Sequence, residues 1–143
     1  PGEIELLADI VKPHMAVITN IGSAHIGFFG SVEKIAEQKK QIFSRFTGDE
    51  TGFVFEEDAF ADYLSENVNG KILRYGSKST PGFIEAHSLG LRGYRVVLEE
   101  GEFNFPIPGG HNLNNLLCAI SVSRSLGADF GHIKAGSESC GAL

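Results

Sequence analysis

Apolar and polar residues alternate along the first half of the chain in a pattern that predicts helices and strands in turn. Residues 3–11 carry apolar side chains at helical spacing, and the Lys12-Pro13 pair ends this helix. Residues 15–20 form an almost continuous apolar run, typical of a strand buried on both faces of a parallel sheet. Further helices are expected from Ser31 as the N-cap to about Phe46 and over 58–68, and further strands over 52–56 and 71–75. This order favours right-handed crossovers and a parallel sheet with helices on its faces.

The pattern changes after residue 76. Three short runs, 83–89, 94–99 and 103–107, are separated by glycine-containing turns, which predicts an antiparallel meander. A helix follows from about Asn112 to Leu126, with Gly127 after its end, and a last short helix is expected over 130–137. The predicted fold class is therefore α/β: a partial Rossmann-like, mostly parallel sheet flanked by helices, plus a small antiparallel β-meander.

Composition and charge exclude several classes of protein. The chain has 143 residues, of which 42% are hydrophobic and 21% charged, so wholesale disorder is not expected. Its net charge is -6 and it has no basic run, which argues against nucleic acid as a partner. No apolar stretch approaches the roughly 20 residues of a membrane-spanning helix, so no membrane partner is expected.

The chain also lacks the features of a secreted protein. Its first ten residues are acidic and have no basic region of the kind that begins a signal peptide. Two cysteines cannot form a disulfide framework, so a reducing cytoplasm is the expected location. The chain begins with Pro1 rather than methionine, and we expect it to be a piece of a longer parent protein.

The loop after the first predicted strand is the first candidate site. Ligands of open α/β sheets bind beyond the carboxyl ends of the strands, where Thr19, Asn20 and His25 stand. His25 has the chemistry to bind a metal ion or a phosphate, or else it is a loop histidine bonded to a nearby carbonyl. Asn20 is a second candidate, although an asparagine at a strand end can equally satisfy backbone groups in a turn.

A lysine on the apolar side of the next helix is the second candidate. Lys39 falls seven residues after Val32, on the same stripe, whereas Lys40 points elsewhere. Such a lysine either extends its amine to water along an apolar surface or is a desolvated amine available for covalent chemistry. Carbamylation by carbon dioxide is one such reaction, and it would turn a cation into a metal-binding carboxylate.

The third candidate lies where the long helix begins, in the run 109–115, GGHNLNN. Asn112 is a plausible N-cap, which would be a purely structural role. Asn115 is expected on the same face of the helix, so the two amides together have the groups to recognise the edge of a base. The two glycines before them would let a flat ligand approach the backbone.

Three motifs occur together in this chain: TNIGSAH at 19–25, GSVEKIAEQK at 30–39 and HNLNN at 111–115. In this order they resemble the central domain of the Mur ligases, the ATP-dependent amide ligases of peptidoglycan synthesis. The resemblance covers nearly the whole chain. It is greatest for the branch that adds D-alanyl-D-alanine to UDP-N-acetylmuramoyl-tripeptide.

The resemblance implies roles for individual residues. His25 matches a histidine that helps to bind magnesium near the ATP γ-phosphate, and Lys39 matches a lysine whose carbamate supports the same ion. Asn112 and Asn115, with His111 in the same motif, match residues around the adenine, and Asn20 matches a position near the phosphates. The implied cofactors are ATP and Mg²⁺, and the implied partners are a nucleotide and a UDP-linked muramyl peptide.

The sequence departs from the family by what it lacks. The phosphate-binding loop G-x-x-G-K-[ST], an upstream glutamate for magnesium and the two flanking domains of the family are absent. We therefore expect residues 1–143 to be the C-terminal part of a central domain, with an antiparallel insertion at 76–110 and no ligase activity of its own. Sheet edges left exposed by missing strands also predict self-association.

Two other functions remain open at this point. The parent protein could be a different Mur ligase or a folylpolyglutamate synthase-like enzyme. Alternatively, the chain is a non-catalytic α/β binding module, although the joint presence of His25, Lys39, Asn112 and Asn115 argues against that.

Overall fold

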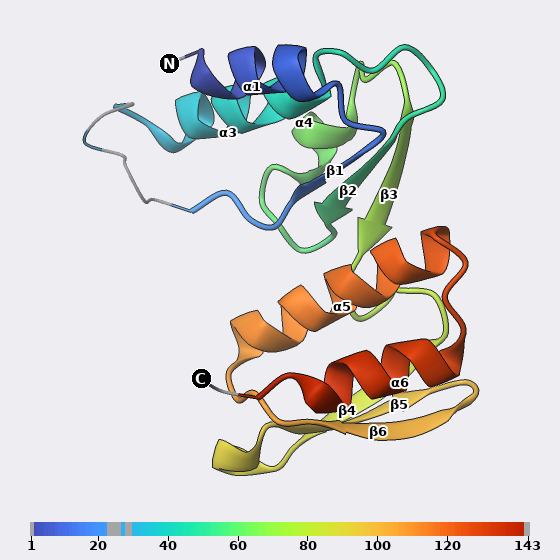
Figure 1. Ribbon diagram of the computed structural model, residues 1–143. Helices are drawn as coiled ribbons and strands as arrows, with labels where there is room; N and C mark the ends of the chain where they lie inside the picture. Colours follow the sequence, from blue (N-terminus) through green and yellow to red (C-terminus); the bar gives the residue numbers. More distant parts are fainter. Residues whose placement is uncertain (1, 23–26, 28–29, 142–143) are drawn as a thin grey trace. The chain divides into compact units, whose positions relative to one another are not determined.

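The computed structural model describes residues 2–22, 27 and 30–141. The chain divides into two compact units, residues 1–74 and 75–143, each with a three-stranded sheet of its own (Figure 1). Among the described residues no helix is both long and apolar enough to cross a membrane.

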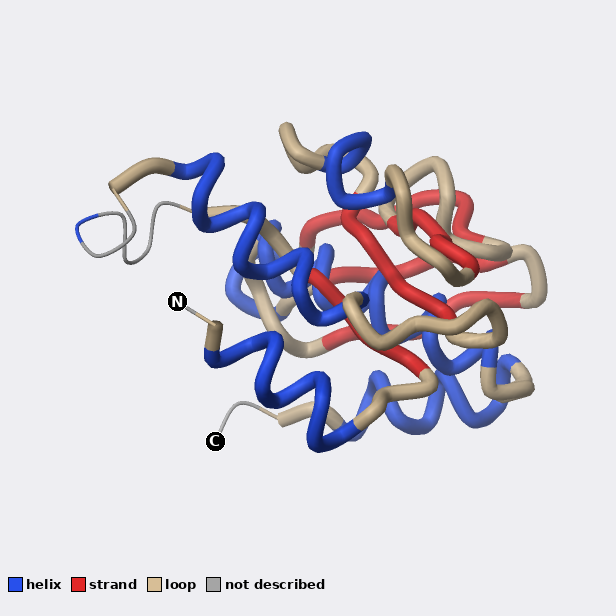
Figure 2. The backbone as a smooth tube through the Cα atoms, turned by 90° about the horizontal axis from the view of Figure 1, so that it is seen from above, coloured by secondary structure: helices blue, strands red, loops and turns tan. Residues whose placement is uncertain are grey.

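The first unit contains a parallel sheet with the strand order β1-β2-β3 (Figure 1). In the pairing of the first two strands, Met15 lies opposite Thr51 and Ile18 opposite Val54. The elements of this unit are α1 (Glu3–Val11), β1 (Met15–Ile18), α3 (Val32–Lys40), the 3-10 turn η1 (Gln41–Phe43), β2 (Thr51–Phe55), α4 (Ala61–Ser65) and β3 (Lys71–Tyr75). Helix α1 runs alongside α3 (Figure 2), and it also contacts η1. The predicted parallel sheet with flanking helices is thus confirmed.

The core of this unit forms between the sheet and the segments that follow α3 and β2. Its buried members come from all of these elements and are Ala16, Ile18, Phe43, Phe46, Val54, Ala61 and Leu64. The rings of Phe43 and Phe46 lie 5.2 Å apart between centroids, at 50° to each other. Aromatic and aliphatic burial of this kind is the main stabilising contribution that the unit has.

The second unit packs two helices on one side of an antiparallel sheet with the order β4-β5-β6 (Figure 1). Its elements are β4 (Phe83–Ser88), the 3-10 turn η2 (Gly90–Arg92), β5 (Tyr94–Leu98), β6 (Gly101–Phe105), α5 (Gly110–Ser125) and α6 (Phe130–Ser139). Val96, Leu98, Phe103 and Phe105 share the buried face of the sheet. Helix α6 packs against β6, and α5 packs against α6. The meander expected after residue 76 is therefore present.

Two helices are shorter than their sequence pattern predicts. The helix expected to reach Phe46 ends at Lys40 and tightens into η1, which turns Phe43 and Phe46 into the core. The helix expected over 58–68 spans only Ala61–Ser65. It starts late because the Asp58 carboxylate accepts the Phe60 N–H and forms a turn, and it ends early at Glu66, whose backbone is extended. The predicted strand 15–20 likewise ends at Ile18.

Candidate functional site

The segment that follows β1 contains the first candidate residues. Thr19 and Asn20 are exposed directly after the strand, as expected for a loop at the carboxyl edge of a parallel sheet. Ile21 continues the segment and packs its side chain against the core. His25, the predicted metal or phosphate residue, lies outside the described residues.

Lys39 lies in the last turn of α3, close to this segment. Helix α3 begins as predicted, because the Ser31 hydroxyl accepts the Lys34 N–H at 3.3 Å. The Lys39 Nζ atom donates to the carbonyl oxygen of Asn20 at 2.7 Å. The side chain is half-buried, so its stem is covered while its amine is fixed on the loop.

The stem of Lys39 also lines a cavity of about 370 Å³ in the first unit. The other lining residues are mostly apolar and come from α1, from β1 and the residues next to it, and from η1: Ile4, Leu7, Ala8, Val11, Pro13, Val17, Ile18, Thr19 and Ile42. The predicted position of Lys39 on an apolar stripe is therefore confirmed. Both sequence interpretations predicted apolar surroundings, and the contact with Asn20 adds a polar anchor that neither included.

Lys40, the next residue, has different neighbours. Its Nζ atom donates to the carbonyl oxygens of Tyr63 at 2.6 Å and Glu66 at 2.7 Å, and it stands 4.4 Å from the centre of the Tyr63 ring. These contacts satisfy carbonyl groups at the C-terminal end of α4. The prediction that the two lysines point to different surroundings is thus confirmed.

Asp58 belongs to this region and was missed by the sequence analysis. One oxygen of its carboxylate accepts the N–H of Ile21 at 2.6 Å, and the other accepts the N–H of Phe60 at 2.9 Å. Asp58 follows β2, and β2 is the parallel neighbour of β1, so the segments after the two strands meet at one edge of the sheet (Figure 1). The sequence did contain a signal that could have identified Asp58: it is an acidic residue just after a second buried strand, at the edge where α/β sheets bind ligands.

The second unit holds the remaining candidates at the start of α5. One interpretation of the sequence predicted that Asn112 is the N-cap of this helix, and it was wrong. The helix begins earlier, and Gly109 is its N-cap. The Asn112 amide instead donates to the carbonyl oxygen of Pro108 at 2.7 Å, which ties the first turn to the segment before it. His111 and Asn115 are exposed. Asn112 and Asn115 are three residues apart in this helix, a spacing that places them on neighbouring positions of its surface.

The two glycines before these residues differ in what surrounds them. Gly109 has φ +99°, and a Cβ there would stand 3.0 Å from Cε1 of His111. Glycine is therefore favoured by both conformation and space. A Cβ on Gly110, by contrast, would meet nothing within 4 Å. The backbone at Gly110 is open to the approach of a flat ligand, as the sequence suggested.

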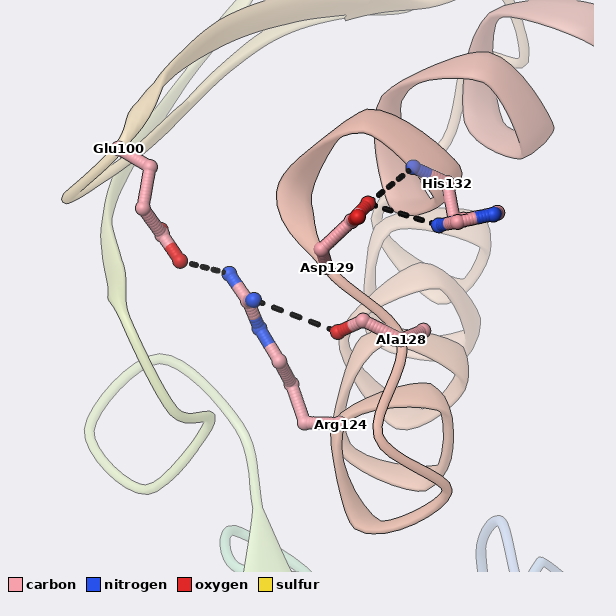
Figure 3. A network of polar contacts seen from close by, with 5 residues as sticks. All are labelled: Glu100, Arg124, Ala128, Asp129 and His132. Atoms are coloured by element: carbon pink, nitrogen blue, oxygen red, sulfur yellow. Dashed lines mark hydrogen bonds and ion pairs between the residues drawn. The ribbon is translucent and has the colours of Figure 1, made fainter.

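A polar network fixes the far end of α5 against the β5–β6 turn (Figure 3). Arg124 forms an ion pair with Glu100 and donates to the Ala128 carbonyl at 3.4 Å. Asp129 then caps α6 by accepting the His132 N–H at 2.9 Å, and it also contacts the His132 ring at 2.7 Å. The His132 N–H is the main reason why the pKa of Asp129 is lowered. This network stabilises the helix that carries the candidate asparagines.

Neither cysteine adds a catalytic candidate in this unit. Both are free thiols, with Cys118 buried and Cys140 exposed. Burial raises the pKa of the Cys118 thiol, which keeps it protonated at neutral pH.

A metal site is not complete within the described part of the chain. Residues 2–22, 27 and 30–141 contain no group of three or more His, Cys, Asp or Glu side chains able to hold an ion. A lysine ammonium repels a cation, so Lys39 would fit a magnesium ion only in its carbamylated form.

Comparison with known proteins identifies the family. The family model of the Mur ligase middle domain matches residues 1–123. The UDP-N-acetylmuramoyl-tripeptide--D-alanyl-D-alanine ligase of Treponema pallidum is 39% identical over 137 residues, which cover 96% of this chain and 30% of that protein. The chain therefore spans under a third of the length of this relative.

Solved structures agree with this result. The crystal structure of MurF from Acinetobacter baumannii superposes with a TM-score of 0.86 at 27% identity and covers 99% of this chain and 32% of its own. MurF from Thermotoga maritima, solved in complex with ADP, gives a TM-score of 0.76 at 25% identity, covering 100% of this chain and 34% of its own. Since the family model matches most of the sequence, this chain belongs to the Mur ligase middle-domain family.

Proposed function

We propose that this chain is part of an ATP-dependent amide ligase of peptidoglycan synthesis, one that joins D-alanyl-D-alanine to UDP-N-acetylmuramoyl-tripeptide. The 39% identity to the UDP-N-acetylmuramoyl-tripeptide--D-alanyl-D-alanine ligase of Treponema pallidum supports this branch. In the parent protein, residues 1–143 would form the C-terminal part of the central domain, with residues 76–110 as an antiparallel insertion. The parent would use ATP and Mg²⁺ and take a nucleotide and a UDP-linked muramyl peptide as its partners.

The observation that carries this proposal is the position of Lys39. Its amine lies at the carboxyl edge of the parallel sheet, on the carbonyl of Asn20, where α/β proteins bind phosphates. The neutral amine can add carbon dioxide to give a carbamate and release a proton. This converts the residue from a cation to an anion that can hold a metal ion, together with His25. Magnesium bound there would offset the negative charge of the phosphates.

The reaction proposed for the parent has two steps. The substrate carboxylate attacks the γ-phosphorus of ATP, which gives an acyl phosphate and releases ADP. The amine of D-alanyl-D-alanine then attacks the acyl carbon, forming the amide and releasing phosphate and a proton. In this chain Asn20 would lie beside the phosphates, and His111, Asn112 and Asn115 would lie beside the adenine. Positioning and charge stabilisation account for most of the catalysis in such transfers.

The test uses the full-length parent protein. Phosphate release from ATP would be measured with UDP-N-acetylmuramoyl-tripeptide, with and without D-alanyl-D-alanine. We expect release that needs both substrates and that falls at least about 100-fold in a Lys39→Ala variant. Activity with another amino acid or with a folate would discard the branch, and no release with any substrate would favour a binding module. The 143-residue chain alone is expected to show no turnover.

We also propose that the isolated chain associates with itself. Among the described strands β1 pairs only with β2, which makes β1 an edge strand of the described sheet, the kind of strand to which another chain can add. Helix α1 adds exposed apolar side chains at Leu6, Leu7, Ile10 and Val11. Light scattering after gel filtration should show the molecular mass rising with concentration. A monomer at every concentration would contradict this proposal.

A further inference from the structure

The peptide group between Asn20 and Ile21 is held at both of its polar ends by side chains of opposite charge. Lys39 donates to its carbonyl oxygen at 2.7 Å, and the Asp58 carboxylate accepts its N–H at 2.6 Å. A peptide carries partial negative charge on oxygen and partial positive charge on N–H, so each side chain matches the end that it contacts. Charge-assisted hydrogen bonds of this kind are stronger than neutral ones.

Asp58 is itself firmly placed. Its second carboxylate oxygen accepts the Phe60 N–H at 2.9 Å, which fixes the rotation of the side chain. Its backbone N–H donates to the Phe55 carbonyl at 3.2 Å, and its own carbonyl accepts the Ala61 N–H at 2.9 Å. Ile21 and Phe60, the two residues whose N–H groups it binds, both pack against the core. The carboxylate therefore joins two segments, each of which is anchored to the core by an apolar side chain.

Lys39 and Asp58 approach the segment after β1 from different elements. Lys39 extends from α3, while Asp58 lies in the connection between β2 and α4. The two contacts also depend on different atoms of the peptide, so the loss of one does not remove the other. Carbamylation would take the positive charge from Lys39 and leave its nitrogen with a single N–H. The carbamate is an anion, so Lys39 would no longer offer a positive charge to the carbonyl oxygen, whereas the contact of Asp58 with the N–H would keep its matching charge.

We propose that Asp58 is a positioning residue for the ligase reaction: it anchors the segment 19–22 through Ile21 and keeps Asn20 in place in either charge state of Lys39. This inference rests on the proposed function, in which that segment lies beside the transferred phosphate. Asp58 acts through the backbone and needs no contact with substrate. Small displacements of positioned groups cost large factors in rate, which makes the anchor important for catalysis.

The anchor itself can be tested on the 143-residue chain. Amide hydrogen exchange at Ile21 would be measured by NMR in the native chain and in Asp58→Ala and Asp58→Asn variants. We expect exchange at Ile21 to quicken about tenfold or more in Asp58→Ala, and less in Asp58→Asn, which keeps one acceptor oxygen. Amides in β3 should not change. Asp62→Asn is the control, because the Asp62 carboxylate is exposed and forms its ion pair with Arg74, at 2.5 Å, away from Ile21. Unchanged exchange at Ile21 would overturn the anchor.

The catalytic consequence is tested in the parent protein. We expect Asp58→Ala to lower kcat at least about tenfold, with KM for the muramyl peptide changed by less than about threefold. The kcat of Asp58→Asn should lie between that of Asp58→Ala and that of the native protein. The kcat of Asp62→Asn should equal that of the native protein. A kcat within about twofold of native in Asp58→Ala would overturn the positioning role. Inactivity of the native parent would overturn the proposed function and this role together, while the exchange measurement still decides whether the anchor exists.

Discussion

The Phe43 ring occupies the space that a side chain on Gly52 would need. Its Cε1 atom lies 2.7 Å from the point where a Cβ on Gly52 would stand, and Cδ1 of Ile72 lies 2.6 Å from the same point. Phe43 belongs to the buried core of the first unit, and Ile72 packs against that core. The missing side chain thus lets the ring after α3 lie directly on the central strand of the sheet.

We predict that Gly52→Ala destabilises the first unit. The added methyl would force Phe43 and Ile72 to move within a packed core, at a cost of about 1–3 kcal/mol. Urea unfolding measures this as a lower midpoint with an unchanged slope. Gly136→Ala is the control, because a Cβ on Gly136 meets nothing within 4 Å in helix α6. That variant should be neutral or slightly stabilising. An unchanged midpoint for Gly52→Ala would show that the ring can shift freely.

Glu50 is predicted to make stability depend on pH in the acid range. Its carboxylate accepts the N–H groups of Thr47 at 2.7 Å and Gly48 at 3.0 Å. The bond from the Thr47 N–H is the largest reason why the pKa of Glu50 falls from 4.5 to about 2. The folded state therefore binds fewer protons than the unfolded state between these values. The stabilisation is complete above pH 4.5 and is lost as the pH falls toward 2.

The measurement is the unfolding midpoint as a function of pH for the native chain and for Glu50→Gln. The native chain should lose stability more steeply between pH 4.5 and 2, and the two curves should converge at the acid end. Parallel curves over that range would contradict the assigned pKa.

The sequence predicted the elements of this fold better than it predicted contacts between them. The helix Glu3–Val11 and the strand Lys71–Tyr75 have the predicted bounds, because periodicity and breakers act locally. The contact between Asp58 and Ile21 spans 37 positions and depends on which strands are neighbours, which no local pattern specifies. Asn112 was a reasonable N-cap by residue type, but the flexible Gly109 begins the helix earlier and the Pro108 carbonyl takes the amide.

We predict that Lys40 contributes to stability. Lys40→Met would remove the donor from two carbonyl groups at the end of α4, those of Tyr63 and Glu66, while keeping most of the apolar stem. The expected loss is about 1–3 kcal/mol in the free energy of unfolding, measured by urea denaturation. Lys34→Met is the matched control, because Lys34 is an exposed residue of the same helix, and its effect should stay within about 0.5 kcal/mol. Equal effects of the two variants would show that these carbonyl contacts add nothing.

We predict that alanine substitutions of Asn112 and Asn115 differ in their effect on stability but both weaken nucleotide binding. Asn112→Ala removes the bond to the Pro108 carbonyl, so it should lower the free energy of unfolding by about 0.5–1.5 kcal/mol. The exposed Asn115 should change stability by less than about 0.5 kcal/mol when replaced by alanine. In the parent protein, calorimetric titration with ADP should show affinity reduced about 2- to 10-fold in both variants, since each would lose a hydrogen bond to the adenine. If Asn115→Ala binds ADP with native affinity, Asn115 is not part of the proposed adenine site. This conclusion is direct because the substitution is expected to leave the stability of the protein almost unchanged.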